Sequence, residues 1–271
     1  MTPSPHDTAA ALRGAYAADG GSPALFSQKV QDYVASRPDY PVALLQALAR
    51  RCPPGADVQV VDVGAGTGLL TQGLLQAGYA VLAVEPSEAM RSAADHALGR
   101  FPCYRSAAGT AEQLPVPEGS VALITAAQAF HWFEVEAARA EFLRVLRPEG
   151  QVALVWNDRV RSDPLHQLLD ERVFGPFGGS KRGALLAHEE RDHVPQFFRH
   201  GRFDELDWPH QHRLDYAGLL SLVCSRSYMP QRGAPGFDAL VECVRQVFDR
   251  CAEAGEVVVR YRTVAMIGRP A

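Results

Sequence analysis

The sequence predicts an α/β fold built on a mostly parallel β-sheet, and two observations carry that prediction. Short β-branched runs alternate with segments of helical apolar spacing from residue 58 to residue 156. Such alternation is typical of βαβ units, whose right-handed crossovers place their strands in parallel. The run at 60–63 is dense in valine, as expected of a strand covered on both faces, and glycines and a helix follow it directly.

The expected elements follow one another along the chain. Two helices, at 26–36 and 42–50, precede the sheet, and prolines at positions 38 and 41 separate them. Strands are expected at 58–62, 80–85, 103–107, 121–126 and 151–156, with helices at 68–77, 87–98 and 134–146. After residue 157 we expect short helices, then a strand at 203–213, helices at 216–225 and 237–254, and a final strand at 256–267.

The composition is that of a cytoplasmic enzyme with one sizeable core. The 271 residues are 47% hydrophobic and 21% charged, and no apolar run approaches the ~20 residues of a membrane span. A net charge of −4 gives no basic footprint for nucleic acid, and the N-terminus has no signal-peptide pattern. The five cysteines include no C-x-x-C pair, so reduced thiols are expected and no metal site.

A glycine-rich turn stands between the first predicted strand and its helix. Gly64, Gly66 and Gly68 occupy alternate positions, and glycine lets a backbone turn tightly and approach a ligand without a Cβ in the way. The next helix directs its N-terminus at this turn, which is the usual arrangement of a nucleotide site. The spacing differs from the G-x-G-x-x-G of dinucleotide sites, and the carboxylate of Asp62 before the turn would repel a pyrophosphate.

Two acids narrow the choice of ligand. Asp62 suits a cationic amino group, and Glu85 closes the second strand, where an acid binds the two hydroxyls of a ribose. A ligand with an adenosine and a charged amino-acid tail but no phosphate satisfies both features, and S-adenosylmethionine is such a ligand. The alternative is a plain strand-to-helix connection, in which Glu85 is an acid favoured by a helix dipole.

Five segments resemble, in order, the motifs of the class I S-adenosylmethionine-dependent methyltransferases. Residues 62–68 are similar to motif I of that family, and Glu85-Pro86-Ser87 is similar to its acidic motif II. Residues 109–115 resemble a loop of the small-molecule branch (methyltransferase type 11) related to the ubiquinone/menaquinone enzymes, and 127–133 a segment of relatives of the trans-aconitate methyltransferases. Residues 146–151 resemble the turn into strand five, so the resemblance covers about 25–157.

The resemblance implies a Rossmann-like, seven-stranded, mostly parallel sheet with an antiparallel edge strand and a small helical lid. One methyltransferase domain would span residues 23–271 after a flexible N-terminal tail at 1–22, with a lid or substrate insertion at about 158–200. The cofactor would be S-adenosylmethionine, with S-adenosylhomocysteine as its product. The residues expected to bind it are Tyr33, Arg37, Asp62, Gly64, Ala65, Gly66, Gly68, Glu85, Pro86, Met90, Thr110, Ala111, Gln128 and Ala129.

Several of these residues also have purely structural interpretations. Tyr33, Arg37 and Tyr40 form a Y-x3-R-P-x-Y-P signature that closes the cofactor site in the resembling family. Arg37 would then pair with the methionine carboxylate, or else it is a solvated side chain at a helix stop. Met90 either lines the adenine pocket or packs in the core, and Ser87 is expected to be a helix N-cap.

His131 is the candidate catalytic residue. It follows the fourth predicted strand, at the sheet edge where ligands bind in open α/β folds, and aromatic residues flank it. We expect His131 to face the methyl acceptor, with Gln128 and Ala129 at the methionine part of the cofactor. The alternative is core packing of the aromatic residues with a His131 satisfied by backbone. A base is needed only when the acceptor loses a proton, and His188 and His193 are secondary candidates for it.

The predicted activity is in-line transfer of a methyl group to a small O-, N- or C-nucleophile, including a carboxylate. Trp156 and Tyr228 weakly favour an apolar or planar acceptor. The segment after strand four lacks the Asp/Asn-Pro-Pro-aromatic motif of amino-methylating DNA enzymes. An NAD-dependent oxidoreductase on a similar sheet and a non-catalytic S-adenosylmethionine-binding protein are the alternatives. Oligomeric state is open.

Overall fold

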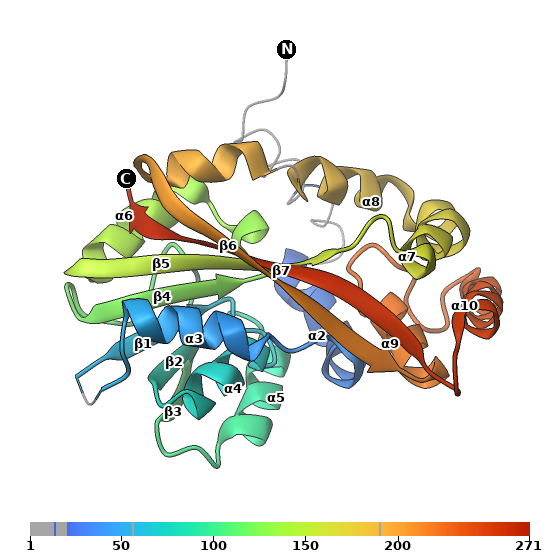
Figure 1. The fold of residues 1–271 in the computed structure, drawn as a ribbon, viewed down its shortest axis with the longest axis horizontal. Helices are drawn as coiled ribbons and strands as arrows, with labels where there is room; N and C mark the ends of the chain where they lie inside the picture. The colour runs from blue at the N-terminus through green and yellow to red at the C-terminus, as the bar shows by residue number, and fades with distance from the viewer. Residues whose placement is uncertain (1–13, 15–20, 56, 190) are drawn as a thin grey trace.

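A twisted β-sheet organises the molecule (Figure 1). The computed structural model describes residues 14, 21–55, 57–189 and 191–271. Within them the sheet has seven strands in the order β3-β2-β1-β4-β5-β7-β6. The parallel strands are β1 (Gln59–Val63), β2 (Ala80–Val84), β3 (Tyr104–Ala107), β4 (Val121–Ala127) and β5 (Leu146–Arg159). β7 (Val257–Pro270) pairs antiparallel with β5 and with the edge strand β6 (Phe198–Leu214), which confirms the predicted fold class.

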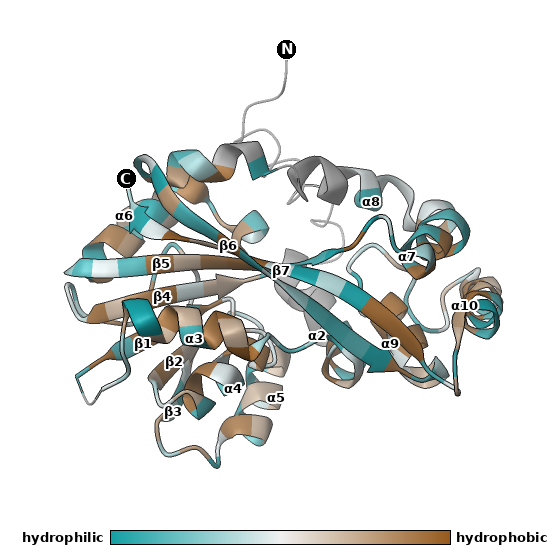
Figure 2. Cartoon of the chain, viewed as in Figure 1, coloured by the Kyte–Doolittle hydropathy of each residue, from teal (hydrophilic) through white to brown (hydrophobic). Residues whose placement is uncertain are grey.

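Apolar side chains cover the two faces of the sheet in separate clusters. Successive residues of a strand point to opposite faces, and Val60 and Val61 of β1 accordingly belong to different clusters. On one face lie α3 (Val42–Arg51), α4 (Leu69–Gln76) and α5 (Glu88–Leu98), and on the other α6 (Val135–Val145) and η3 (Arg191–Phe197). Figure 2 shows the central strands largely apolar and β6 largely polar, as its edge position requires.

A helical lobe with its own apolar cluster adjoins the sheet. It comprises α7 (Pro164–Leu169), η2 (Asp170–Phe174), α8 (Gly175–Glu189), α9 (Tyr216–Cys224) and α10 (Phe237–Cys251). The far ends of β6 and β7 extend beyond the sheet and join this cluster through Leu214, Val257 and Val259. Figure 1 shows the two strands running from the sheet into the lobe, where α2 (Gly21–Ser36) also lies. The first part of the segment predicted as a lid, residues 165–177, thus shares a core with residues 219–251, whereas Val194, Phe197 and Phe198 belong to the cluster on the α6 face of the sheet.

Side-chain caps fix several helix starts at the positions that the sequence predicts. The Ser87 hydroxyl accepts a hydrogen bond from the backbone N–H of Met90 at 3.4 Å, so Ser87 is the N-cap of α5. The Asp163 carboxylate accepts from the N–H of Leu165 at 3.0 Å at the start of α7. The predicted central elements agree with the structure to within about two residues, except that β5 begins earlier and ends later. Of the expected tail, residues 21 and 22 begin α2, and 1–13 and 15–20 lie outside the described residues.

Candidate functional site

The three glycines of the turn after β1 have three different surroundings. All have positive φ: 65° at Gly64, 58° at Gly66 and 85° at Gly68. A Cβ on Gly64 would stand 2.7 Å from the Cβ of Ala129, and one on Gly68 would stand 2.5 Å from Leu98 Cδ1. A Cβ on Gly66 would meet nothing within 4 Å. Gly64 and Gly68 therefore permit close packing, whereas Gly66 borders open space at the carboxyl edge of the sheet.

Asp62 lies beneath the turn and is only 1% exposed. Its Oδ2 accepts a hydrogen bond from the Thr71 hydroxyl at 2.6 Å, and its Oδ1 accepts one from the Thr125 hydroxyl at 2.7 Å. Burial raises the pKa of Asp62 to about 6, although both hydroxyls act to lower it. The carboxylate thus ties the turn to the start of α4 and to β4.

Glu85 connects the glycine turn to the end of β2. Its Oε2 accepts a hydrogen bond from the backbone N–H of Gly66, and its Oε1 accepts one from that of Ser87, both at 2.9 Å. The side chain is largely buried, and burial raises its pKa. These bonds hold the carboxylate directly beside the one glycine of the turn that borders open space.

The loops after β3 and β4 complete the same edge. Glu112 accepts a hydrogen bond from the backbone N–H of Glu134 at 2.8 Å, which ties the first loop to the start of α6. In this loop Thr110 is exposed and Ala111 is buried. Gln128 has a φ of 55°, an uncommon value for a residue with a side chain, and its Nε2 donates to the Asn157 carbonyl at 3.2 Å. The backbone after β4 is therefore held in a strained conformation where the site is expected.

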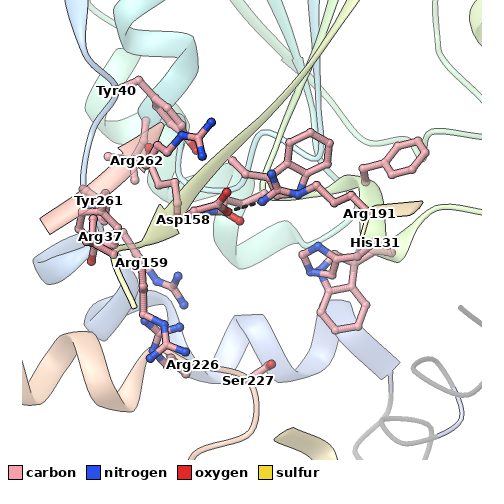
Figure 3. Close-up of a pocket in the computed structure, with 18 of the residues that line it drawn as sticks. Arg37, Tyr40, His131, Asp158, Arg159, Arg191, Arg226, Ser227, Tyr261 and Arg262 are labelled. Carbon is pink, nitrogen blue, oxygen red and sulfur yellow. Dashed lines mark hydrogen bonds and ion pairs between the residues drawn. The ribbon is translucent and has the colours of Figure 1, made fainter. Parts of the chain in front are cut away.

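A cavity of about 650 Å³ opens beside this edge (Figure 3). The ends of β4 and β5, the segment between α2 and α3, and the helical lobe all contribute to its wall. Asn157 joins these parts, because its side chain donates to the Asp39 carbonyl at 3.1 Å and accepts from the Thr263 hydroxyl at 2.6 Å. Leu69, which begins the helix after the glycine turn, also lines the cavity.

The aromatic segment after β4 divides between core and cavity. Phe130 and Phe133 are 2% and 6% exposed and belong to the core cluster of α6. His131 and Trp132 are half-buried and line the cavity, with ring centroids 4.9 Å apart. Phe130 also borders the cavity, so Phe133 alone of these four lies in the core without reaching the cavity wall.

Arginines stand around the cavity in unusual number, and several have acidic partners. Arg191 pairs with Asp158 and stacks over Trp156, with its guanidinium carbon 4.2 Å from the ring centroid. Arg159 donates to Asp170 at 2.9 Å. Arg37 takes neutral partners instead: its Nε donates to the Ser225 hydroxyl at 2.9 Å, and burial lowers its pKa.

The structure brings some of the predicted residues to this cavity and leaves others beside it. Tyr33, Arg37, Gln128 and His131 line it, as do the aromatic residues Trp156 and Tyr228. The other predicted residues do not line it: they lie in β1 and the glycine turn, between β2 and α5, in α5, and in the loops after β3 and β4. They are Asp62, Gly64, Ala65, Gly66, Gly68, Glu85, Pro86, Met90, Thr110, Ala111 and Ala129. Met90 is buried. The side chains of His188 and His193 lie outside the described residues.

Sequence reasoning missed Arg159, Arg191, Arg226 and Tyr261, all of which line the cavity. Arg159 ends β5, so its place after a parallel strand was an available signal. Arg191 begins η3, Arg226 follows α9 and Tyr261 lies in the antiparallel strand β7, and no sequence motif marks them. Among the described residues, no helix is long and apolar enough to cross a membrane, and no group of three metal-ligating side chains occurs.

Known proteins resemble this chain in sequence. The family model described as a methyltransferase domain matches residues 61–154. A protein of Mycobacterium tuberculosis described as an uncharacterized methyltransferase is 34% identical over 222 residues, which cover 82% of this chain and 84% of that protein. A fission yeast protein (Schizosaccharomyces pombe) with the same description is 32% identical over 166 residues, covering 59% of this chain and 65% of the relative.

A solved structure shares the fold as well. It is described as a putative type II methyltransferase from Anaeromyxobacter dehalogenans, and it is 28% identical with a TM-score of 0.57. The match covers 86% of this chain and 97% of that one. The chain therefore belongs to the class I S-adenosylmethionine-dependent methyltransferases, the family that its motifs resemble.

Proposed function

We propose that this enzyme methylates a small-molecule acceptor bound in the 650 Å³ cavity, with S-adenosylmethionine held across the adjoining glycine turn. One observation carries the proposal: Gly66, with open space where its Cβ would stand, lies next to the Glu85 carboxylate. This cradle fits an adenosine, because the backbone can approach a ligand closely and a carboxylate can accept from ribose hydroxyls.

The predicted cofactor residues divide between two ends of this cradle. Glu85, Pro86, Met90, Thr110 and Ala111 would hold the adenosine end. Tyr33, Arg37, Gln128 and Ala129 would hold the methionine end, with Gly64, Ala65 and Gly68 shaping the turn. Asp62 supports the turn from beneath, where its two threonine partners hold the carboxylate.

The protein's contribution is alignment and exclusion of water. The cofactor supplies a methyl group activated by its sulfonium, which an acceptor lone pair displaces in line as the carbon–sulfur bond breaks. Residues that hold the acceptor in line with that bond can supply ~7–11 kcal/mol of the barrier reduction. The helical lobe, including the predicted lid at 158–200, would shield the cavity from water in one domain spanning 23–271.

His131 is proposed to face the acceptor, since it lines the cavity directly after the strained Gln128 segment. An acceptor that loses a proton would give it to His131, whereas a carboxylate acceptor needs no base. Equal turnover of the His131→Asn variant and the wild type would remove His131 from catalysis. The free cysteines support a reducing, cytoplasmic compartment.

Thermal unfolding of the full chain with S-adenosylhomocysteine and, separately, with NAD tests the cofactor. We expect S-adenosylhomocysteine to raise the thermal midpoint and NAD to leave it unchanged. Stabilisation by NAD alone would contradict the proposal. Methyl transfer to any acceptor would then exclude the non-catalytic alternative.

A further inference from the structure

We propose that the acceptor carries an oxyanion, a carboxylate or a phosphate, and that Arg159, Arg226 and Tyr261 hold this group at the helical-lobe end of the cavity. The inference deepens the proposed function and rests on it for the role of the cavity. It is carried by three features of the cavity wall: its charge, the packing of two guanidiniums on one ring, and a buried phenol.

The cavity wall carries an excess of positive charge. Among the described residues that line it, the basic side chains are Arg37, Arg159, Arg161, Arg191, Arg226 and Arg262, and the acidic side chain is Asp158. Asp158 is taken by Arg191, and Arg262 pairs outward with Asp207 at 2.7 Å. Arg159 also has an acidic partner, Asp170. Among the described lining residues, basic side chains still outnumber acidic ones, and this excess favours an anionic ligand.

Two of these guanidiniums pack on the same aromatic ring. The guanidinium carbons of Arg226 and Arg159 stand 4.7 Å and 5.1 Å from the ring centroid of Phe174. Asp170, four residues earlier in the π-helical segment η2, is shared between Arg159 at 2.9 Å and Arg182 at 3.1 Å. The Asp170 carboxylate thus faces two cations, Arg159 and Arg182. A bound anion beside Arg159 and Arg226 would offset the repulsion between these two guanidiniums.

Tyr261 supplies a hydrogen-bond donor at the same place. It is 4% exposed, and its hydroxyl has no hydrogen-bond partner among the described residues. Burial raises its pKa, so the phenol keeps its proton at neutral pH, while Arg226, Arg37 and Arg159 act in the opposite direction. Arg159 stands opposite Tyr261 in the register of β5 and β7, and Arg226 lines the same cavity. A buried hydroxyl without a partner is costly, and an anion would accept from it.

The position of this cluster suits an anchor for the acceptor. Figure 3 shows Arg159, Arg226 and Tyr261 on one side of the cavity and His131 on the other. An oxyanion held by planar guanidiniums at one end would orient the rest of the molecule toward the reacting edge. The cluster thus selects the acceptor without taking part in the methyl transfer.

Citrate and inorganic phosphate are suitable probes. Each is titrated into the full chain, with and without S-adenosylhomocysteine, at an ionic strength kept constant with sodium chloride. The variants are Tyr261→Phe and Arg226→Gln; the first removes only a hydroxyl that bonds to no described residue. Arg161→Gln is the matched control, because Arg161 is an exposed arginine at the same cavity but outside the cluster.

We expect at least one probe to bind the wild type, with affinity about tenfold weaker in Tyr261→Phe and Arg226→Gln and less than twofold weaker in Arg161→Gln. The affinity for S-adenosylhomocysteine should stay unchanged in Tyr261→Phe, and equal thermal midpoints would show that this variant folds.

Binding of phosphate alone would indicate a phosphorylated acceptor, and binding of citrate alone would indicate a polycarboxylate. The proposal is overturned if neither probe binds better than chloride, or if Arg161→Gln weakens binding as much as Tyr261→Phe. Probe binding with no binding of S-adenosylhomocysteine would support the anion site and contradict the proposed cofactor.

Discussion

The glycine-turn side of the site is made of backbone and carboxylates, whereas the helical-lobe side of the cavity is made of guanidiniums and a phenol. On the first side, Asp62 and Glu85 are buried among hydroxyl and N–H donors. On the second, Arg159 and Arg226 pack on Phe174, and the buried Tyr261 stands opposite Arg159 in the register of β5 and β7. The first side suits the adenosine of the proposed cofactor, and the second suits the proposed anionic acceptor.

This difference in charge accompanies a difference in origin. The carboxylate side follows two adjacent parallel strands and their turns, so its residues come from short, continuous segments. The guanidinium side draws on the end of β5, the connection after α9 and the strand β7, which lie far apart in the sequence. Substitutions on one side of the site should therefore change the ligand affinity of that side or the stability of the fold.

Substitution of Gly66 should have the largest effect, and on the cofactor side only. Gly66→Ala places a methyl group in the open space of the cradle, so we expect affinity for S-adenosylhomocysteine to fall at least ~100-fold while citrate binding persists. Gly119→Ala is the control, because Gly119 has a φ of 62° and likewise nothing within 4 Å. Both variants carry the same backbone strain of ~1–2 kcal/mol. Equal cofactor affinity in the two variants would contradict the cradle.

The pH dependence of stability should report Asp62. Its pKa is raised from 3.8 to about 6 in the folded state, so between these values the folded protein holds more protons than the unfolded chain. This group's contribution is present below pH 3.8 and is lost as the pH rises through about 6, by up to ~3 kcal/mol. Urea unfolding of the wild type and Asp62→Asn from pH 4 to 7 measures the difference, which should change most between about pH 4 and pH 6 and level off above pH 6. Parallel pH profiles would contradict the raised pKa.

Lys29 allows a test of the helical-lobe side of the cavity. Its ammonium is 3% exposed and donates to the carbonyls of Cys224, Arg226 and Met229 at 2.8–2.9 Å, so α2 holds the segment that carries Arg226. Lys29→Met leaves these carbonyls without their donor, and we expect a loss of ~2 kcal/mol in the free energy of unfolding. Citrate affinity should fall with it, while cofactor affinity changes little. Hydrogen exchange measures the expected loosening of α9, and an unchanged exchange rate there would rule out this role.

Substitution of Glu85 should have the smallest of these effects. Glu85→Gln keeps one oxygen for the N–H of Gly66 or Ser87 but cannot satisfy both and accept from a ribose as well. We expect S-adenosylhomocysteine affinity to fall about tenfold, measured by calorimetry. Glu88→Gln, an exposed acid in the first turn of α5, is the matched control and should bind as the wild type does. Citrate affinity should be equal in both variants.

The sequence predicted the sheet and the glycine turn closely, because both depend on local patterns. The valine run at 60–63, the glycines after it and Ser87 each act on their own neighbours in the chain. The sequence did not reveal that both oxygens of Asp62 are taken by Thr71 and Thr125, since Thr125 lies 63 positions away. It also did not indicate which residues after β4 enter the core, because Phe130 and His131 are adjacent and differ only in the direction of their side chains.

The sequence by itself predicted the fold and the place of the glycine turn, because strand period, glycine conformation and helix capping are short-range physics. The class of enzyme followed from the resemblance of its motifs to a known family. Only the tertiary structure decided the chemistry of the acceptor side. Arg159, Arg226 and Tyr261 meet because β7 returns antiparallel beside β5 and carries its far end into the helical lobe. No local sequence pattern indicates that these residues lie close together, so only the tertiary structure reveals the cation cluster.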